Sequence, residues 1–265
     1  MARRTPTPST RPARRAPRDA TADTSASAAE LERYPRPSVA VDVVALTVAG
    51  GALEVALYER ATAPSQRVAP WALPGGFMHL DESLEDTAAR VLRDKVGLAG
   101  VFLEQLFTFG DVHRDPRGRV LTVAYYALVD AARFTVERAE SPRATCRARL
   151  DVPWAGETGG PVFAHDPDGR PLELFLDHAD ILGLAVKRLR GKLDYTPVGF
   201  QLLPAEFTLR ELQVVHEVVR GEAVNKDSFR RRMLASGLLE ATGAHERDVG
   251  YRPAELYRFS RRSAT

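Results

Sequence analysis

The sequence predicts an α+β protein in which a β-rich domain, residues 38–195, is followed by a small helical module with a β-wing, residues 196–265. Three observations lead to this fold class. Runs rich in β-branched and aromatic residues occur in pairs separated by turn signals, amphipathic helical patterns accompany them, and the composition changes after Tyr195-Thr196-Pro197. Residues 1–37 are predicted to be a disordered tail, because Ala, Arg, Pro, Thr and Ser bury too little apolar surface to offset their ordering entropy.

The composition narrows the class of protein. The chain has 265 residues, of which 44% are hydrophobic and 27% charged, as expected for a water-soluble protein with a real core. One cysteine excludes a disulfide framework and a Cys-rich zinc site, and favours a reducing cytoplasm. No apolar run approaches the ~18–20 residues of a membrane helix, and the basic start lacks the apolar stretch of a secretory signal. We therefore expect a cytoplasmic protein without membrane contact.

The charges are unevenly distributed. Residues 1–38 carry 8 Lys and Arg against 4 Asp and Glu, and residues 196–265 carry 11 against 9, whereas the middle is acidic, at 18 against 22. Basic ends are a weak indication of nucleic acid at the ends. The first 18 residues hold six arginines and no acidic residue. This composition is typical either of an arm that binds a polyphosphate such as nucleic acid or of a tail whose sequence is not under selection.

The β-rich domain begins with two predicted hairpins. SVAVDVVALTV and ALEVALYER are joined at Gly50-Gly51, and VFLEQLFTFGDV pairs with GRVLTVAYYALV across Asp115-Pro116-Arg117-Gly118, which fits a type I turn. Residues 138–170 are predicted to be irregular, with Trp154 as an isolated anchor. PLELFLDHADILGLAVKRLRGKL is then predicted to pass from a strand end into a helix that Asp177 or Asp180 caps and Gly191 ends.

A further helix is predicted between the hairpins. In HLDESLEDTAARVLRDKV, Asp81 or Ser83 provides the N-cap and Gly97 sits where a left-handed C-terminal residue belongs. One side of this helix is apolar and faces the core; its members are Leu84, Ala88, Val91, Leu92 and Val96.

The stretch around this helix resembles the Nudix box, in which Gly, five residues, Glu and seven residues precede Arg-Glu-apolar-any-Glu-Glu-any-Gly-apolar. Matching positions are Gly76, Glu82, Arg90, Leu92, Gly97 and Leu98. The resemblance implies a Nudix-like α/β/α sandwich, with loop glycines that approach a pyrophosphate and carboxylates that hold Mg²⁺ against it.

The departures from that pattern predict a loss of catalysis. Val91 and Lys95 stand where the family has glutamates, and only Asp94 keeps a carboxylate in that core. We therefore expect no catalytic residues and no required cofactor. Glu82 and Asp94 remain as candidate metal ligands, and Mg²⁺ is expected only if residual hydrolysis exists.

The resemblance implies a ligand made of a nucleoside diphosphate linked to another group. Arginine suits bidentate phosphate contacts and Trp71 offers an aromatic face, although solvated charges and ordinary core packing also explain these residue types. The candidate ligand-binding residues are Arg60, Trp71, Gly75, Gly76, Glu82, Asp94, Arg114 and Arg119.

The second module has the pattern of a helix-turn-helix with a wing. FTLRELQVVHEVVRG predicts an amphipathic helix capped by Thr208, and NKDSFRRRMLASGLLEATG a second helix opened by Asn225 and broken at Gly237, before a wing over GAHERDVGYRPAELYRFS. Phe229 and Met233 should face the core, which leaves polar and basic side chains for a major groove. The candidate DNA-binding residues are Arg210, Lys226, Ser228, Arg230, Arg231, Arg232, Arg247, Arg252 and Arg258.

Over about residues 38–260 the chain resembles the Nudix-related transcriptional regulators, in which a Nudix-like effector domain precedes a C-terminal winged helix. The resemblance rests on RDPRGRV before VAYYALV, on FLDHADIL with RLRGKLDYTP, on LLPAEFTLRELQ, and on FRRRML with YRPAELYRF. It implies a homodimer on a palindromic double-stranded operator, a repressor of NAD biosynthesis or salvage genes, and release by ADP-ribose or a related nucleotide-sugar. Such a protein would lie in the bacterial cytoplasm, on the nucleoid when bound to its operator.

Two other interpretations stay open from the sequence alone. The chain would be a Mg²⁺-dependent pyrophosphatase acting on ADP-ribose or a similar nucleotide if the tail module served only dimerisation. It would be a ligand-binding adaptor if the second module bound no duplex.

Overall fold

The computed structural model describes residues 30, 32–61, 71–136, 144–193, 195–247, 250 and 252–260. The chain divides into two units, Met1–Pro37 and Ser38–Thr265, and the elements below belong to the second. Disorder was predicted for residues 1–37. Of these, residues 1–29 and residue 31 lie outside the described part of the chain. Among the described helices, none is long and apolar enough to cross a membrane.

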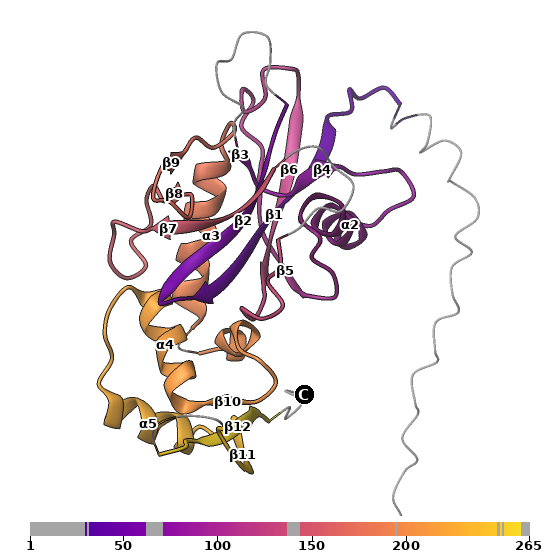
Figure 1. Ribbon diagram of the computed structural model, residues 1–265. Coiled ribbons are helices and arrows are strands. Elements are labelled where there is room, and N and C mark those ends of the chain that lie inside the picture. Colours follow the sequence, from indigo (N-terminus) through magenta and orange to yellow (C-terminus); the bar gives the residue numbers. More distant parts are fainter. Residues whose placement is uncertain are drawn as a thin grey trace, which may run out of the picture. The chain divides into compact units, whose positions relative to one another are not determined.

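A mixed sheet forms the centre of this unit (Figure 1). Its main path runs in the order β5-β6-β1-β2-β7-β8-β9; these strands are Phe102–Phe109, Val120–Leu128, Ser38–Ala49, Ala52–Glu59, Thr145–Asp151, Phe163–His165 and Pro171–Leu172. Both predicted hairpins are confirmed, because β1 pairs with β2 and β5 with β6 in antiparallel register. β1 and β6 run parallel, and two short strands, β3 (Trp71–Ala72) and β4 (Gly75–Phe77), pair with β2 and β1.

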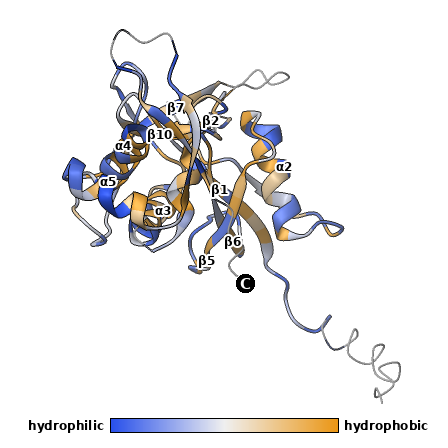
Figure 2. Ribbon diagram, turned by 90° about the horizontal axis from the view of Figure 1, so that it is seen from below, coloured by the Kyte–Doolittle hydropathy of each residue, from blue (hydrophilic) through white to orange (hydrophobic). Residues whose placement is uncertain are grey.

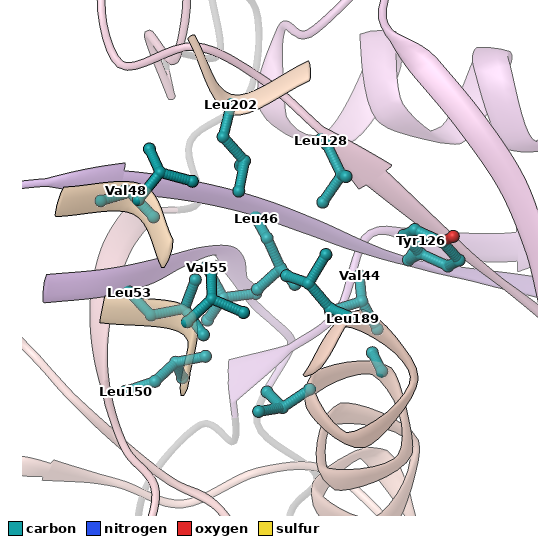
Figure 3. Packing of buried hydrophobic residues seen from close by; sticks show 14 of the residues in the cluster. Val44, Leu46, Val48, Leu53, Val55, Tyr126, Leu128, Leu150, Leu189 and Leu202 are labelled. Carbon is teal, nitrogen blue, oxygen red and sulfur yellow. The ribbon is translucent and has the colours of Figure 1, made fainter. Parts of the chain in front are cut away.

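The sheet is buried on both faces because the side chains of β1 alternate. Val44 and Leu46 belong to one apolar cluster, which also holds Leu189 and Leu202 (Figure 3). Ala45, between them in sequence, belongs to a second cluster on the opposite face, together with Val43. This period of two explains why β1 reads as an almost continuous apolar run.

One helix covers each face of the sheet (Figure 2). α2 (Leu84–Val96) is the predicted helix between the hairpins, with Ser83 rather than Asp81 as its N-cap and Gly97 at a φ of 74° as its C-cap. α3 (His178–Lys192) starts after Asp177, whose side chain makes no capping hydrogen bond. The predicted stop at Gly191 is wrong, because α3 runs through it to Lys192.

The prediction that residues 138–170 are irregular is also wrong for β7 and β8. β7 pairs with β2 along Glu54–Tyr58, and its buried residues alternate with arginines. Arg147 donates hydrogen bonds to Glu54 across the pair, so a strand face that looks solvated in the sequence is neutralised within the sheet. Trp154 does act as an anchor, since its indole donates to the Pro161 carbonyl and the ring packs on the core.

The last part of the chain builds the predicted pair of helices and wing. After a 3-10 helix, Pro197–Leu202, it forms β10 (Phe207–Thr208), α4 (Leu209–Arg220), α5 (Lys226–Ala235), β11 (Leu239–His245) and β12 (Glu255–Phe259). Thr208 caps α4 in a capping box with Glu211, and Asn225 caps α5, as predicted. β10, β12 and β11 form the wing sheet.

One boundary in this part differs from the prediction. The second predicted helix included Leu239–Gly243. In the structure these residues belong to strand β11, which pairs with β12. Gly237, at a φ of 70°, directly follows the end of α5 and reverses the chain. The buried side chains of α4 join the same apolar cluster as β1, so one core continues from the central sheet into the helices.

Candidate functional site

A cavity of about 410 Å³ opens beside the first half of β1, where β4, the end of α2 and the segment before α3 meet. This size suits a small organic ligand. Its lining residues are Ala40, Asp42, Tyr58, Arg60, Ala61, Gly75, Gly76, Phe77, Lys95, Arg114, Asp115, Arg117, Val120, Phe175, Leu176 and His178. Four of the eight predicted ligand-binding residues, Arg60, Gly75, Gly76 and Arg114, are therefore together.

Asp42 lies at the floor of this cavity and is buried in β1. Its Oδ2 accepts a hydrogen bond of 2.7 Å from the Thr122 hydroxyl on β6. Gly75 packs so closely that a Cβ there would lie 2.0 Å from Asp42 Oδ1. The buried carboxylate of Asp42 is thus what requires a glycine at position 75. Asp42 was not among the predicted site residues. The signal that could have identified it is a single acidic residue within an apolar strand.

Arg114 is held against the floor rather than extended towards solvent. Its side chain is 4% exposed and donates two hydrogen bonds to Asp177, of 2.8 and 2.7 Å. The same guanidinium lies 3.8 Å from Asp42. Bidentate pairing with a carboxylate fixes the orientation of the arginine.

His178, the first residue of α3, completes this wall. Its Nδ1 accepts a hydrogen bond of 3.0 Å from the Leu73 backbone N–H, and its Nε2 lies 3.8 Å from Asp42 Oδ1. Complete burial lowers the pKa of His178. A proton on Nδ1 would remove the acceptor that Leu73 uses, so the neutral imidazole fits this position.

The other side of the cavity is aromatic and cationic. The Arg60 guanidinium lies 3.8 Å from the centre of the Phe175 ring, a cation–π contact. Leu176, next along the cavity wall, has a φ of 48°, a left-handed conformation that is unusual for a leucine. Asp115 and Arg117 pair through two side-chain hydrogen bonds, which lower the pKa of Asp115 to about 2.

The other four predicted ligand-binding residues are not among those that line the cavity. Trp71 packs against the core and pairs in β3, and Arg119 donates to the carbonyls of Gly110 and Asp111. Glu82 accepts two hydrogen bonds from Arg90, which lower its pKa to about 2. Asp94 lies on the exposed face of α2 beside Arg93.

The residues at the α2 end of the cavity do not fit a divalent cation. Val91 is fully buried and its Cγ1 would lie 3.1 Å from a Cβ at Gly76, while Lys95 brings an ammonium to the cavity lining. Mg²⁺ prefers carboxylate oxygens, and Glu82 already serves Arg90. Within the described ranges, no three His, Cys, Asp or Glu side chains gather where they would hold a metal ion.

A second candidate surface is formed by α5 and the wing. Phe229 is buried and contacts His216 on α4, and Met233 is half-buried, as predicted, whereas Ser228, Arg231 and Arg232 are exposed. Between α4, α5 and β12 lies a cavity of about 840 Å³. Its lining includes four of the predicted DNA-binding residues, Arg210, Lys226, Arg230 and Arg252, together with His245.

Two of the predicted DNA-binding arginines are neutralised by carboxylates. Arg258 donates two hydrogen bonds, of 3.1 and 2.7 Å, to Glu240 across the wing, and Arg210 lies 3.3 Å from Glu217. Arg247 and Arg252 are exposed near the turn of the wing. Arg210 and Arg258 are themselves 63% and 56% exposed, so both pairs lie at the surface of the module.

Comparisons with known proteins identify a family for each of the two modules. Residues 36–151 match the NUDIX domain family, and residues 199–259 match the NrtR DNA-binding winged helix domain family. The chain is 36% identical over 229 residues, which is 86% of it and 84% of the relative, to the ADPR responsive transcriptional repressor NtrR of Acinetobacter baylyi.

Solved structures show the same arrangement of domains. The crystal structure of Shewanella oneidensis NrtR complexed with a 27mer DNA matches at a TM-score of 0.66 and 33% identity, over 84% of this chain and 93% of that one. A MutT/nudix family protein from Enterococcus faecalis matches at a TM-score of 0.69 and 25% identity, over 91% and 95%. The chain therefore belongs to the NrtR family, in which a Nudix domain is followed by a DNA-binding winged helix domain.

Proposed function

We propose that this protein is a DNA-binding transcriptional repressor whose Nudix domain senses ADP-ribose or a related nucleotide-sugar. The observation that carries the proposal is the presence, in one compact unit, of a cavity lined by cationic and aromatic side chains and of an exposed basic helix, α5, in a winged helix module. A relative with 36% identity is named an ADPR responsive repressor.

The chemistry of the cavity supports a nucleotide-sugar as effector. The Arg60 guanidinium stacked on Phe175 supplies charge beside an apolar face, and the backbone of Gly75 and Gly76 lines the same cavity. Aromatic and cationic groups together suit a ligand that has rings at its ends and a diphosphate between them.

We place the DNA contacts on α5 and the wing. Ser228 and Arg231 face outwards and are the first candidates for base edges, and Arg230, Arg232 and Arg252 are candidates for phosphates. Residues 38–195 then form the effector domain and residues 196–265 the DNA-binding domain. Two copies in a homodimer would hold their α5 helices one duplex turn apart, roughly 34 Å, on a palindromic operator.

Regulation follows from differential affinity. A ligand shifts the population between DNA-competent and DNA-incompetent arrangements only by the ratio of its affinities for the two. We propose that ADP-ribose favours the incompetent arrangement, that hydrolysis plays no part, and that the regulated genes serve NAD biosynthesis or salvage in a bacterial cytoplasm.

The test is a fluorescence anisotropy titration of the full chain with the duplex upstream of its own gene, at fixed salt, with and without ADP-ribose. The same samples are assayed for AMP with and without Mg²⁺. We expect specific binding that ADP-ribose weakens and no AMP. AMP formed only with Mg²⁺ and lost in Asp94→Asn, without duplex binding, would make the protein a pyrophosphatase. Binding of ADP-ribose without salt-sensitive duplex binding would make it an adaptor.

The assignment of α5 has its own test. Arg231→Ala should weaken operator binding and reduce discrimination against unrelated duplexes, since loss of a base contact costs about 1–3 kcal/mol. Arg93→Ala removes an exposed arginine from α2 and is the matched control. Operator affinity and discrimination that stay intact in Arg231→Ala would exclude α5 as the recognition helix.

A further inference from the structure

Lys95 lies where the cavity meets the last turn of α2. It follows Val91 by four residues, so both side chains project from the same face of the helix. Val91 packs under Gly76, and Lys95 lines the cavity together with Gly75 and Gly76. The Lys95 ammonium also lies 5.2 Å from the centre of the Tyr58 ring, which places the side chain along the cavity wall.

The charge at this position is opposite to that of a metal ligand. Glutamates at positions 91 and 95, as in the Nudix box, would face the glycine loop and hold a divalent cation between themselves and a diphosphate. Here the first position is apolar and the second carries a positive charge. An ammonium repels a divalent cation and attracts a diphosphate directly.

The lining of the cavity holds three further cations, Arg60, Arg114 and Arg117. Arg114 pairs with Asp177, and Arg117 pairs with Asp115. A carboxylate partner offsets much of the attraction that an arginine offers to a phosphate. Arg60 lies against Phe175 and 3.5 Å from the Tyr58 hydroxyl, so Arg60 and Lys95 both lie beside Tyr58.

We propose that Lys95 takes the place of the divalent cation, so that this chain binds the diphosphate of its effector directly and without metal. The inference rests on the proposed function, because it concerns the recognition of that effector. The Lys95 N–H groups donate to diphosphate oxygens above the Gly75-Gly76 backbone. Binding without hydrolysis follows from the same substitution, since an ammonium neutralises the diphosphate but supplies no metal-activated water.

Isothermal titration of the full chain with ADP-ribose, in EDTA and in MgCl₂, tests the inference. We expect the wild type to bind with the same affinity, within about twofold, in both. Lys95→Met keeps the aliphatic stem and should lose about tenfold or more in affinity in both buffers, as expected for removal of a charge-assisted hydrogen bond. Arg93→Ala removes a positive charge from the exposed face of the same helix and should bind as the wild type does.

Charge reversal provides a second variant. Lys95→Glu should lose more affinity in EDTA than Lys95→Met, because it places a carboxylate against the diphosphate. Thermal melts of each variant confirm that it is folded. Wild-type affinity in Lys95→Met overturns the inference.

Metal dependence separates this inference from the proposed function. Binding of ADP-ribose by the wild type in MgCl₂ but not in EDTA overturns the role of Lys95 and leaves the effector assignment intact. The absence of binding in both buffers overturns the effector assignment and the inference with it.

Discussion

The guanidinium of Arg190 on α3 donates a hydrogen bond of 2.7 Å to the backbone carbonyl of Val219, near the end of α4. It also donates to the carbonyls of Trp154 and Gly156, and it stacks 4.5 Å from the Trp154 ring. Burial lowers the pKa of Arg190. The same helix begins at His178 in the wall of the effector cavity, so α3 joins the cavity at one end to α4 at the other.

Replacement of Arg190 by methionine should lower the free energy of unfolding by about 2–3 kcal/mol. The variant keeps an apolar stem but leaves buried backbone carbonyls without donors, each of which carries a desolvation cost. Urea unfolding at pH 7 measures the effect. Lys187→Met, at an exposed position on the same helix, is the control. A loss in Arg190→Met no larger than in the control would contradict the structural role of this contact.

Gly75→Ala should destabilise the protein by about 1–3 kcal/mol, as expected for overpacking a closed site. The added Cβ would lie 2.0 Å from Asp42 Oδ1, so Asp42 must move away from the Thr122 hydroxyl. Thermal unfolding and ADP-ribose titration should both register the change. Gly250→Ala meets open space and serves as the control. A variant as stable as the wild type would show that Asp42 relaxes at little cost.

Acidification should destabilise the protein through His178. Burial holds its pKa in the folded state below the ordinary value of about 6.5, so only the unfolded chain takes up a proton as the pH falls below that value. The free energy of unfolding therefore decreases as the pH falls from about 6.5 towards the lowered folded pKa.

Urea unfolding between pH 7.5 and about 5 tests this assignment. His178→Gln keeps an acceptor for the Leu73 N–H without titrating, so its stability should depend less on pH than that of the wild type. His113→Gln removes an exposed imidazole and is the matched control. An unchanged slope in His178→Gln would assign the acid sensitivity to other groups.

Two arginines of the wing should differ in their effect on DNA binding. Arg258→Ala should change affinity little, because Glu240 already neutralises its guanidinium. Arg252→Ala should weaken binding to all duplexes alike and reduce the salt slope by about 1, as for loss of one phosphate contact. Anisotropy titrations at several salt concentrations measure both. A larger loss in Arg258→Ala than in Arg252→Ala would reverse the assignment.

Most elements of the fold were predictable because their signals are local. The Gly50-Gly51 turn, the Ser83 and Thr208 caps, and the spacing of Leu209, Leu212 and Val215 each occupy a few adjacent residues. β7 was missed because Arg147 finds its carboxylate on another strand, 93 residues away. Gly191 was misread because its backbone is helical rather than left-handed, so α3 continues through it to Lys192.

The candidate site divides in the same way. Gly75, Gly76, Arg60 and Arg114 were predicted from the Nudix resemblance and charge, and they line the cavity. Asp42 and His178 were not predicted, because each depends on partners from distant strands and helices. Sequence reasoning also read Lys95 only as a loss of metal binding, whereas its position on the cavity wall gives it a role of its own.

The sequence by itself determined the two hairpins, the capped helices, the family and the types of side chain available for phosphate and DNA. Periodicity, caps and turn residues act over a few positions and can be read without a partner. The tertiary structure alone decided which charges remain for ligands. Arg258 and Arg114 look alike in the sequence, but each lies against a carboxylate that only folding brings near, at Glu240 and at Asp177. Electrostatic interactions depend on distance in space, and that distance is set by the packing of the whole chain.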